Sequence, residues 1–169
     1  MKKIIVVGCP GSGKSTFSRE LNRITHIPLF HLDMMYWNAD KTTVDKNTFY
    51  ERLSDVLEKE QWIIDGNYAS TMELRLRKSD TVFFLDYPTE ICLDGITKRR
   101  GKPRSDIPWI ESDDSDSEFI EFIKRYRLQN RPEVFELLGK YSDKSIFIFT
   151  ERNQADEFLV KLQKRILSI

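Results

Sequence analysis

The sequence has no excess of charge of either sign. Its 169 residues include 27 Lys and Arg and 27 Asp and Glu, so the formal net charge is zero. Without a net field, nothing draws the whole molecule to nucleic acid or to an anionic membrane. Any site that binds an anion must therefore be local.

Cysteines and long apolar runs are also scarce. The two cysteines, Cys9 and Cys92, are too few for a disulfide framework, and they predict free thiols in the cytosol. The N-terminal apolar run is too short for a signal peptide or a membrane span. There is no internal repeat and no linker long enough to divide the chain. We therefore expect one cytoplasmic domain over residues 1–169.

A glycine-rich loop near the N-terminus is the most informative stretch. An apolar, β-branched run over residues 4–7 predicts a strand buried on both faces of a parallel sheet. It leads into GCPGSGKS at residues 8–15, which matches the phosphate-binding loop (P-loop) pattern G-x-x-x-x-G-K-[ST]. A helical pattern follows at once, as the motif requires. The expected nucleotide contacts are Gly8, Pro10, Gly11, Ser12, Gly13, Lys14, Ser15 and Thr16.

The residue types of this loop fit the chemistry of a polyphosphate. Glycines let backbone N–H groups turn inward and approach the phosphates closely. The helix that begins near Gly13 adds its unpaired amides and the positive end of its dipole. Lys14 can reach the β- and γ-phosphates, and the Ser15 hydroxyl can bind Mg²⁺. The loop therefore predicts ATP and Mg²⁺ as cofactors.

Strand patterns recur along the rest of the chain. They occur near residues 28–31, 62–64, 81–85 and 145–149, and helical patterns separate them. Strands that alternate with helices predict an α/β fold with a parallel sheet and right-handed crossovers.

Carboxylates follow three of these strands. Asp33, Asp65 and Asp86 each come just after an apolar run. The carboxyl ends of the strands form the edge where open α/β sheets bind ligands. Asp65 is the better candidate for a Mg²⁺ ligand, because Asp86 can instead cap the turn at Pro88.

A cluster of soft and aromatic side chains follows the second strand. We expect Met34 and Met35 to belong to the core, and His31 to have a structural role at the strand end. Tyr36 and Trp37 fit the core and a wall or flap of a pocket equally well.

The most basic segment covers residues 98–106, with the sequence KRRGKPRSD. Such a run fits a solvated face, a nucleic-acid patch, or a lid whose guanidinium groups neutralise a transferring phosphoryl group. The acidic run at residues 113–118 would repel DNA phosphates, so we favour a lid over about 99–118.

Several motifs occur together in an order typical of one family. They are the P-loop, His31-Leu32-Asp33 with Tyr36-Trp37, Trp62-Ile63-Ile64-Asp65-Gly66-Asn67-Tyr68, Phe84-Leu85-Asp86-Tyr87-Pro88, Arg104-Ser105-Asp106 and Asn130-Arg131-Pro132. With these, the chain resembles the adenylate-kinase-like P-loop proteins of the DNA topology modulation (FlaR-related) family over nearly its whole length.

This resemblance implies a three-layer α/β/α, nucleoside monophosphate kinase-like fold with a five-stranded parallel sheet of order 2-3-1-4-5. It places an acceptor-binding region at about residues 33–60. The site residues that it implies are Asp33 and Asp65 beside the acceptor and Mg²⁺, Asn67 and Arg75 on the acceptor, and Arg99, Arg100 and Arg104 in the lid.

One departure from the family pattern concerns the acceptor. True adenylate kinases continue from the Asp-Gly turn with Phe-Pro-Arg, whereas this chain has Asn67-Tyr68. The arginine that would hold the phosphate of AMP is missing at that point, which argues against AMP.

The sequence therefore predicts an ATP-dependent phosphotransferase that acts on a small acceptor, a nucleotide or a nucleoside. In this hypothesis Lys14 and the lid arginines stabilise the moving phosphoryl group, and Asp33 or Asp65 orients the acceptor. We expect no membrane partner and a monomer or homodimer. The alternatives are a nucleotide-dependent DNA-binding regulator without kinase activity, and a plain P-loop ATPase.

Overall fold

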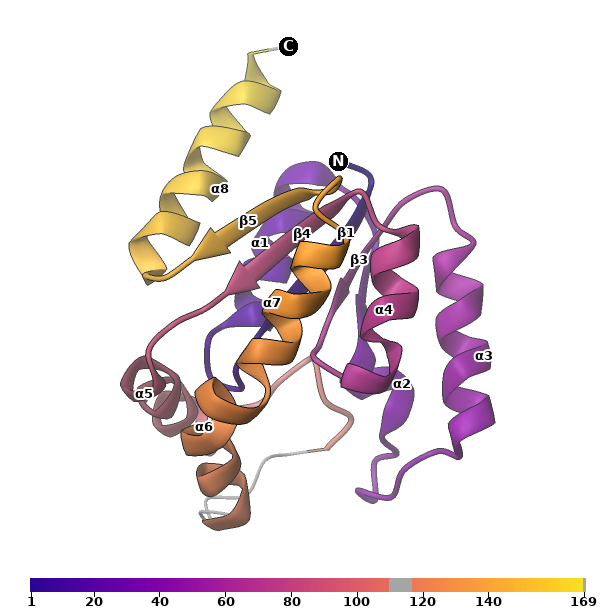
Figure 1. The fold of residues 1–169 in the computed structure, drawn as a ribbon, viewed down its shortest axis with the longest axis vertical. Helices are drawn as coiled ribbons and strands as arrows, with labels where there is room; N and C mark the ends of the chain where they lie inside the picture. Colours follow the sequence, from indigo (N-terminus) through magenta and orange to yellow (C-terminus); the bar gives the residue numbers. More distant parts are fainter. Residues whose placement is uncertain (110–116, 169) are drawn as a thin grey trace.

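The computed structural model describes residues 1–109 and 117–168. Its centre is a parallel sheet with the strand order β2-β3-β1-β4-β5 (Figure 1). This confirms the predicted topology, with the P-loop strand in the middle. The strands are β1 (Lys3–Gly8), β2 (Leu29–His31), β3 (Trp62–Asp65), β4 (Thr81–Leu85) and β5 (Ser145–Phe149).

Helices cover both faces of the sheet and complete the predicted three layers (Figure 1). One face packs against α1, α5, α6 and α8, and the other against α3, α4 and α7. The helices are α1 (Lys14–Thr25), α2 (Leu32–Tyr36), α3 (Lys46–Leu57), α4 (Ala69–Lys78), α5 (Thr89–Arg99), α6 (Ser117–Gln129), α7 (Arg131–Lys140) and α8 (Arg152–Leu167).

The central strand shows why the sheet needs two helical layers. Ile4 and Val6 belong to one core cluster, whereas Ile5 and Val7 belong to the other. All four are fully buried. Successive side chains of a strand point to opposite faces, so an unbroken apolar run requires cover on both.

Two helix ends follow from the residue types found there. Asp45 caps α3, because its side chain accepts hydrogen bonds from the backbone N–H groups of Asn47 and Thr48, each at 3.0 Å. The helical segment is interrupted at Asn130, between α6 and α7. Pro132 lies in the first turn of α7, where its missing N–H costs nothing.

The predicted core position of Met34 is wrong. Its side chain is 44% exposed, whereas the neighbouring Met35 packs against the core. The reason is that α2 is a five-residue helix at the end of the sheet, and only its Leu32 is buried.

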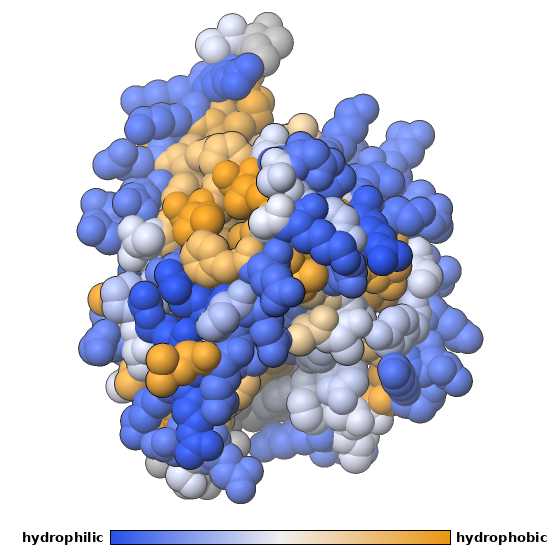
Figure 2. Space-filling model, viewed as in Figure 1, coloured by the Kyte–Doolittle hydropathy of each residue, from blue (hydrophilic) through white to orange (hydrophobic). Residues whose placement is uncertain are grey.

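The surface is polar over most of the face shown in Figure 2, and hydrophobic atoms gather where β5 and α8 form one edge. β5 is an edge strand, and Ile148 on it is 41% exposed. Within residues 1–109 and 117–168, no helix has both the length and the apolar character needed to cross a bilayer.

Candidate active site

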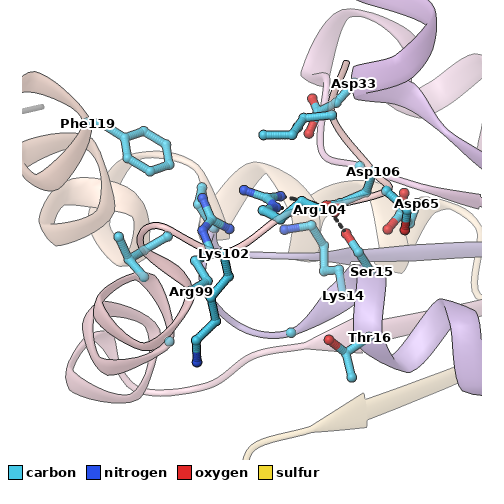
Figure 3. Close-up of a pocket in the computed structure, with 18 of the residues that line it drawn as sticks. Lys14, Ser15, Thr16, Asp33, Asp65, Arg99, Lys102, Arg104, Asp106 and Phe119 are labelled. Carbon is cyan, nitrogen blue, oxygen red and sulfur yellow. Dashed lines mark hydrogen bonds and ion pairs between the residues drawn. The ribbon is translucent and has the colours of Figure 1, made fainter. Parts of the chain in front are cut away.

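A cavity of about 990 Å³ opens at the carboxyl ends of the strands, beside the P-loop. This is the position at which open parallel sheets bind ligands. Its walls come from the P-loop, from the segments that follow β2 and β3, from α5 and α6, and from residues 100–109 (Figure 3).

The P-loop glycines have the backbone geometry that the motif predicts. Gly11 and Gly13 have φ angles of 82° and 91°, which residues other than glycine rarely adopt. A Cβ on Gly13 would meet no atom within 4 Å, although this residue lies directly before α1 and lines the cavity. The open space and the helix N-terminus together leave room for an anion at this point.

Helix α5 packs closely against the backbone of the P-loop. A Cβ on Gly95 of α5 would lie 2.1 Å from the carbonyl oxygen of Gly11, and a Cβ on Gly11 would lie 2.0 Å from that of Cys92. Only glycines allow the two backbones to lie this close. The sequence gives no sign of this role of Gly95, because an isolated glycine in a helical pattern does not reveal what packs against it.

Lys14 lies on the P-loop backbone in this structure. Its Nζ donates to the carbonyl oxygens of Gly8 at 2.9 Å and Cys9 at 3.2 Å. Burial lowers the pKa of Lys14, and the negative charges of Asp65 and Asp33 oppose this effect. The ammonium group is therefore close to two acidic side chains of the cavity wall.

Ser15 forms an unexpected contact with the chain beyond α5. Its hydroxyl donates to Oδ2 of Asp106 at 2.8 Å, and Arg104 donates to the same oxygen at 2.5 Å (Figure 3). Burial opposes ionisation of Asp106, but the hydrogen bond and charge of Arg104 outweigh it and hold the pKa of this carboxyl well below its ordinary value. In the sequence, Asp106 ends the basic segment and belongs to the motif Arg104-Ser105-Asp106, but nothing in its sequence context reveals a buried carboxylate at the P-loop.

Asp65 is fixed at the end of β3 by a histidine. His31 Nδ1 and Asp65 Oδ1 are 2.7 Å apart, and Asp65 is 3% exposed. The other oxygen, Oδ2, is buried and has no hydrogen-bond partner among the residues that the structure describes. A buried carboxylate oxygen without a partner, on a residue that lines the cavity, can accept a hydrogen bond from a ligand or coordinate a cation.

These oxygen donors fit a Mg²⁺ ion that is held largely by nucleotide phosphates. Such ions keep several waters and use one or two carboxylates of the protein. Ser15, Asp65 and Asp106 supply a hydroxyl and two carboxylates around Lys14. In the described part of the chain, no group of three or more His, Cys, Asp or Glu residues forms a complete protein cage for a metal.

Asp33 lies on the same cavity wall and accepts a 2.7 Å hydrogen bond from the Tyr68 hydroxyl. Burial raises the pKa of Asp33, while the hydrogen bond from Tyr68 and the charge of Lys14 work in the opposite direction. Asn67 also lines the cavity, and its Oδ1 accepts from the backbone N–H of Gly8 at 3.0 Å.

Arg75, the second expected acceptor contact, lies elsewhere. Its side chain is fully buried and is not among the residues that line the cavity. The guanidinium donates to the carbonyl oxygens of Gly66 at 2.9 Å and Tyr68 at 3.2 Å, and also to that of Asn67. Arg75 thus holds the loop after β3 from inside and does not face the cavity.

The basic residues of the expected lid do face the cavity. Arg99, Arg100, Lys102 and Arg104 all line it, as Figure 3 shows for three of them. The guanidinium carbon of Arg99 lies 6.0 Å from the centre of the Phe119 ring. Residues 110–116 of the expected lid, and with them most of the acidic run, lie outside the described residues.

Two tryptophans meet at the cavity. The ring centres of Trp37 and Trp109 are 5.5 Å apart at an angle of 77°, and both rings line the cavity. The wall hypothesis therefore describes Trp37, whereas Tyr36 packs against the core through Phe49 and Tyr68. Trp109 carried no signal in the sequence.

Asp86 does not line the cavity. Arg131 binds both of its carboxylate oxygens at 2.7 Å, and the same guanidinium lies 4.5 Å from the centre of the Phe135 ring. The carboxylate after β4 thus anchors the start of α7, a role different from the expected turn cap.

Residues 4–121 match the model of a family described as AAA domain (AAA_18). The match covers more than half of the chain. This chain belongs to that AAA domain family. No curated protein matches the sequence.

Solved kinase structures share the fold of this family member. A shikimate kinase from Acinetobacter baumannii in complex with shikimate has a TM-score of 0.63 at 17% identity, over 99% of this chain and 94% of that one. The shikimate kinase of Bacteroides thetaiotaomicron has 0.57 at 20% identity, over 98% of both chains. A sugar kinase from Janibacter sp. HTCC2649 has 0.53 at 13% identity, over 99% of this chain and 93% of that one. At these identities the likeness concerns the fold alone.

Proposed function

We propose that this protein is an ATP-dependent phosphotransferase, which moves the γ-phosphoryl group of ATP to a small acceptor of the nucleotide or nucleoside type. The observation that carries the proposal is that the P-loop and the carboxylates Asp33 and Asp65 line the same cavity. A plain ATPase needs a water at the γ-phosphate, whereas this cavity extends over a second wall of carboxylate and aromatic side chains. The kinase folds of its structural neighbours support the same assignment.

Each residue of the site has a defined part in this reaction. The amides of the P-loop bind the phosphates, and Lys14 leaves the carbonyls of Gly8 and Cys9 to contact the β- and γ-phosphates. The guanidinium groups of Arg99, Arg100 and Arg104 stabilise charge on the transferring group. Mg²⁺, when bound near Ser15 and Asp65, would neutralise charge on the phosphate oxygens.

Closure over the site favours transfer to the acceptor over hydrolysis. Asp106 and Arg104 already join the segment after α5 to the P-loop. With nucleotide bound, this segment would exclude water from the γ-phosphate while the acceptor lies against Asp33.

The test is a screen for acceptor-dependent formation of ADP. The panel holds nucleosides, nucleotides, sugars and small hydroxy acids, each at a fixed concentration of ATP and Mg²⁺. We expect at least one acceptor to raise ADP formation tenfold or more above the rate with ATP alone, and Lys14→Ala to abolish the increase. A Lys164→Ala variant, on the remote surface of α8, serves as the matched control.

Two results would contradict the proposal. If ADP forms equally fast with and without every acceptor, the protein is an ATPase. If calorimetry detects no binding of ATP with Mg²⁺, the P-loop is not a nucleotide site. A regulator that binds DNA would instead show an affinity for duplex DNA that falls steeply with salt.

A further inference from the structure

The two halves of the cavity differ in charge. The half that follows β2 and β3 presents six side chains, namely Asp33, Trp37, Lys41, Asp65, Asn67 and Tyr68. Two of these are carboxylates, three are aromatic or amide groups, and one is a lysine. The other cationic side chains that line the cavity come from the P-loop and α1, from α5 and the segment after it, and from α8.

Arg75 could have added a positive charge to this half, but it does not line the cavity. Arg75 belongs to the helix that follows β3, but its guanidinium is buried against three carbonyl oxygens of residues 66–68. Arg104, which is close enough to Asp33 to affect its charge, is held by Asp106 at the P-loop. Lys41 is therefore the one cation that this half contributes among the described residues, and it is exposed at a loop.

A phosphate group on the acceptor would fit this half poorly. It would lie beside Asp33 and Asp65 without the bidentate arginine that phosphate sites normally provide. Two carboxylates next to a dianion repel it strongly, particularly in a partly buried cavity.

A flat, uncharged ring with hydroxyl groups fits much better. Trp37 and Trp109 offer aromatic surface at the cavity, and Tyr68 lies beside them through Tyr36. Asn67 can read polar groups on a ring edge. Asp33 is a carboxylate at the cavity wall, held in place by the Tyr68 hydroxyl at 2.7 Å, and it can accept a hydrogen bond from a substrate hydroxyl.

We infer that the acceptor is a phosphate-free nucleoside-like molecule, whose base packs on Trp37 and Trp109 and whose hydroxyl is bound by Asp33. This inference rests on the proposed function. The hydroxyl oxygen forms a bond to the γ-phosphorus, the bond from that phosphorus to the bridging oxygen breaks, and ADP leaves with the electron pair. The hydroxyl proton passes to the Asp33 carboxylate.

The test compares matched pairs of acceptors. Adenosine, guanosine, cytidine and thymidine are each measured against their own 5′-monophosphate, with ATP and Mg²⁺, and the phosphorylated products are identified by mass. We expect at least one nucleoside to exceed its monophosphate by about 100-fold or more in kcat/KM.

Variants separate chemistry from binding. Asp33→Asn should lower kcat by about 10²- to 10⁴-fold while the affinity for the nucleoside, measured by calorimetry with a non-hydrolysable ATP analogue, stays within threefold. Trp37→Leu should raise KM with little change in kcat. The control is Asp40→Asn, because Asp40 is an exposed carboxylate in the loop after α2 and does not line the cavity.

The outcomes are distinct. If monophosphates are used as well as nucleosides or better, the inference is overturned and the kinase assignment stands. If sugars or hydroxy acids are phosphorylated but no nucleoside or nucleotide is, the inference and the proposed acceptor type are both overturned, and only the phosphotransferase assignment stands. If no acceptor of any class raises ADP formation, the proposed function fails and the inference fails with it.

Discussion

The hydroxyl of Ser15 donates a 2.8 Å hydrogen bond to the carboxylate of Asp106, which lies 91 positions further along the chain. Ser15 is the residue through which a P-loop holds its metal ion. A carboxylate at this position carries the charge of a metal ligand and, in the same place, repels a nucleotide that arrives without its metal. We therefore expect nucleotide binding to depend on the metal.

The first prediction concerns this carboxylate. In Asp106→Asn, binding of ATP without metal should strengthen, because a negative charge next to the phosphates is lost. The Mg²⁺ concentration that gives half-maximal nucleotide binding should rise about tenfold. Calorimetry with EDTA and with a Mg²⁺ series measures both, with Asp55→Asn as control, because Asp55 is an exposed carboxylate of α3 that does not line the cavity. This role is ruled out if the affinity for ATP changes in the same direction with EDTA and with Mg²⁺.

The second prediction concerns the close approach of α5 to the P-loop. In Gly95→Ala the new methyl group would lie 2.1 Å from the Gly11 carbonyl oxygen, so the loop must shift. We expect a loss of about 1–3 kcal/mol in the free energy of unfolding and a weaker affinity for ATP. Gly139→Ala in α7 is the matched control, because its methyl group would meet nothing within 4 Å and should stabilise the helix by up to about 1 kcal/mol. Equal effects of the two variants in urea unfolding would contradict the packing argument.

The third prediction compares two arginines of α4. Arg75→Met removes the guanidinium donor from the carbonyl oxygens of Gly66 and Asn67, whereas the Tyr68 carbonyl keeps the backbone N–H and hydroxyl of Thr71. We therefore expect the free energy of unfolding to fall by about 2–5 kcal/mol. Arg77→Met, at a site where the side chain is 64% exposed, should change it by less than about 0.5 kcal/mol. Burial lowers the pKa of Arg75 to about 9, so this group remains charged at neutral pH. A stability of Arg75→Met within the range of the control would show that the loop has another support.

The fourth prediction concerns the pH dependence of the reaction. Burial raises the pKa of Asp33, and the hydrogen bond from Tyr68 partly reverses this. In the proposed reaction the ionised carboxylate accepts the hydroxyl proton, so kcat should rise with pH through a pKa above the ordinary value of an aspartate. Tyr68→Phe removes the opposing hydrogen bond, so the acid limb of the profile should move to still higher pH. A profile that does not move on this substitution would exclude Asp33 as the titrating group.

The raised pKa of Asp33 also makes the stability of the protein depend on pH. A carboxyl whose pKa is higher in the folded state than in the unfolded state costs folding free energy once it ionises. The cost is absent below the unfolded pKa and grows as pH rises to the folded value. In urea titrations, Asp33→Asn should therefore gain stability relative to the wild type above this window and not below it.

The sequence was sufficient where the signal is local. The run Ile4–Val7, the P-loop glycines and the alternation of strands with helices each depend on neighbours in the chain, and the sheet order and the P-loop geometry agree with them. The positions of Asp33 and Asp65 could also be predicted, because a residue that follows a parallel strand lies at the carboxyl edge of the sheet.

The remaining features depend on which distant segments meet. Asp106 reaches Ser15 and Trp109 reaches Trp37 only because residues 100–109 fold back over the P-loop. From the same helical pattern Arg75 could face solvent, substrate or core, and its hydrogen bonds to the carbonyl oxygens of residues 66–68 decide its direction. No spacing rule contains this information, since the partners are separated by lengths of chain that sequence periods do not cover.

The clamp between Asp86 and Arg131 has a consequence for how this molecule can move. The chain from α5 to the start of α7 is anchored at both ends, by the glycine contact between α5 and the P-loop and by the bidentate ion pair at the end of β4. A displacement of residues 100–109 would break the contact of Asp106 with Ser15, whereas the two anchors hold α5 and the start of α7 in place. In the proposed enzyme, movement of residues 100–109 for product release would therefore leave both helix anchors in place.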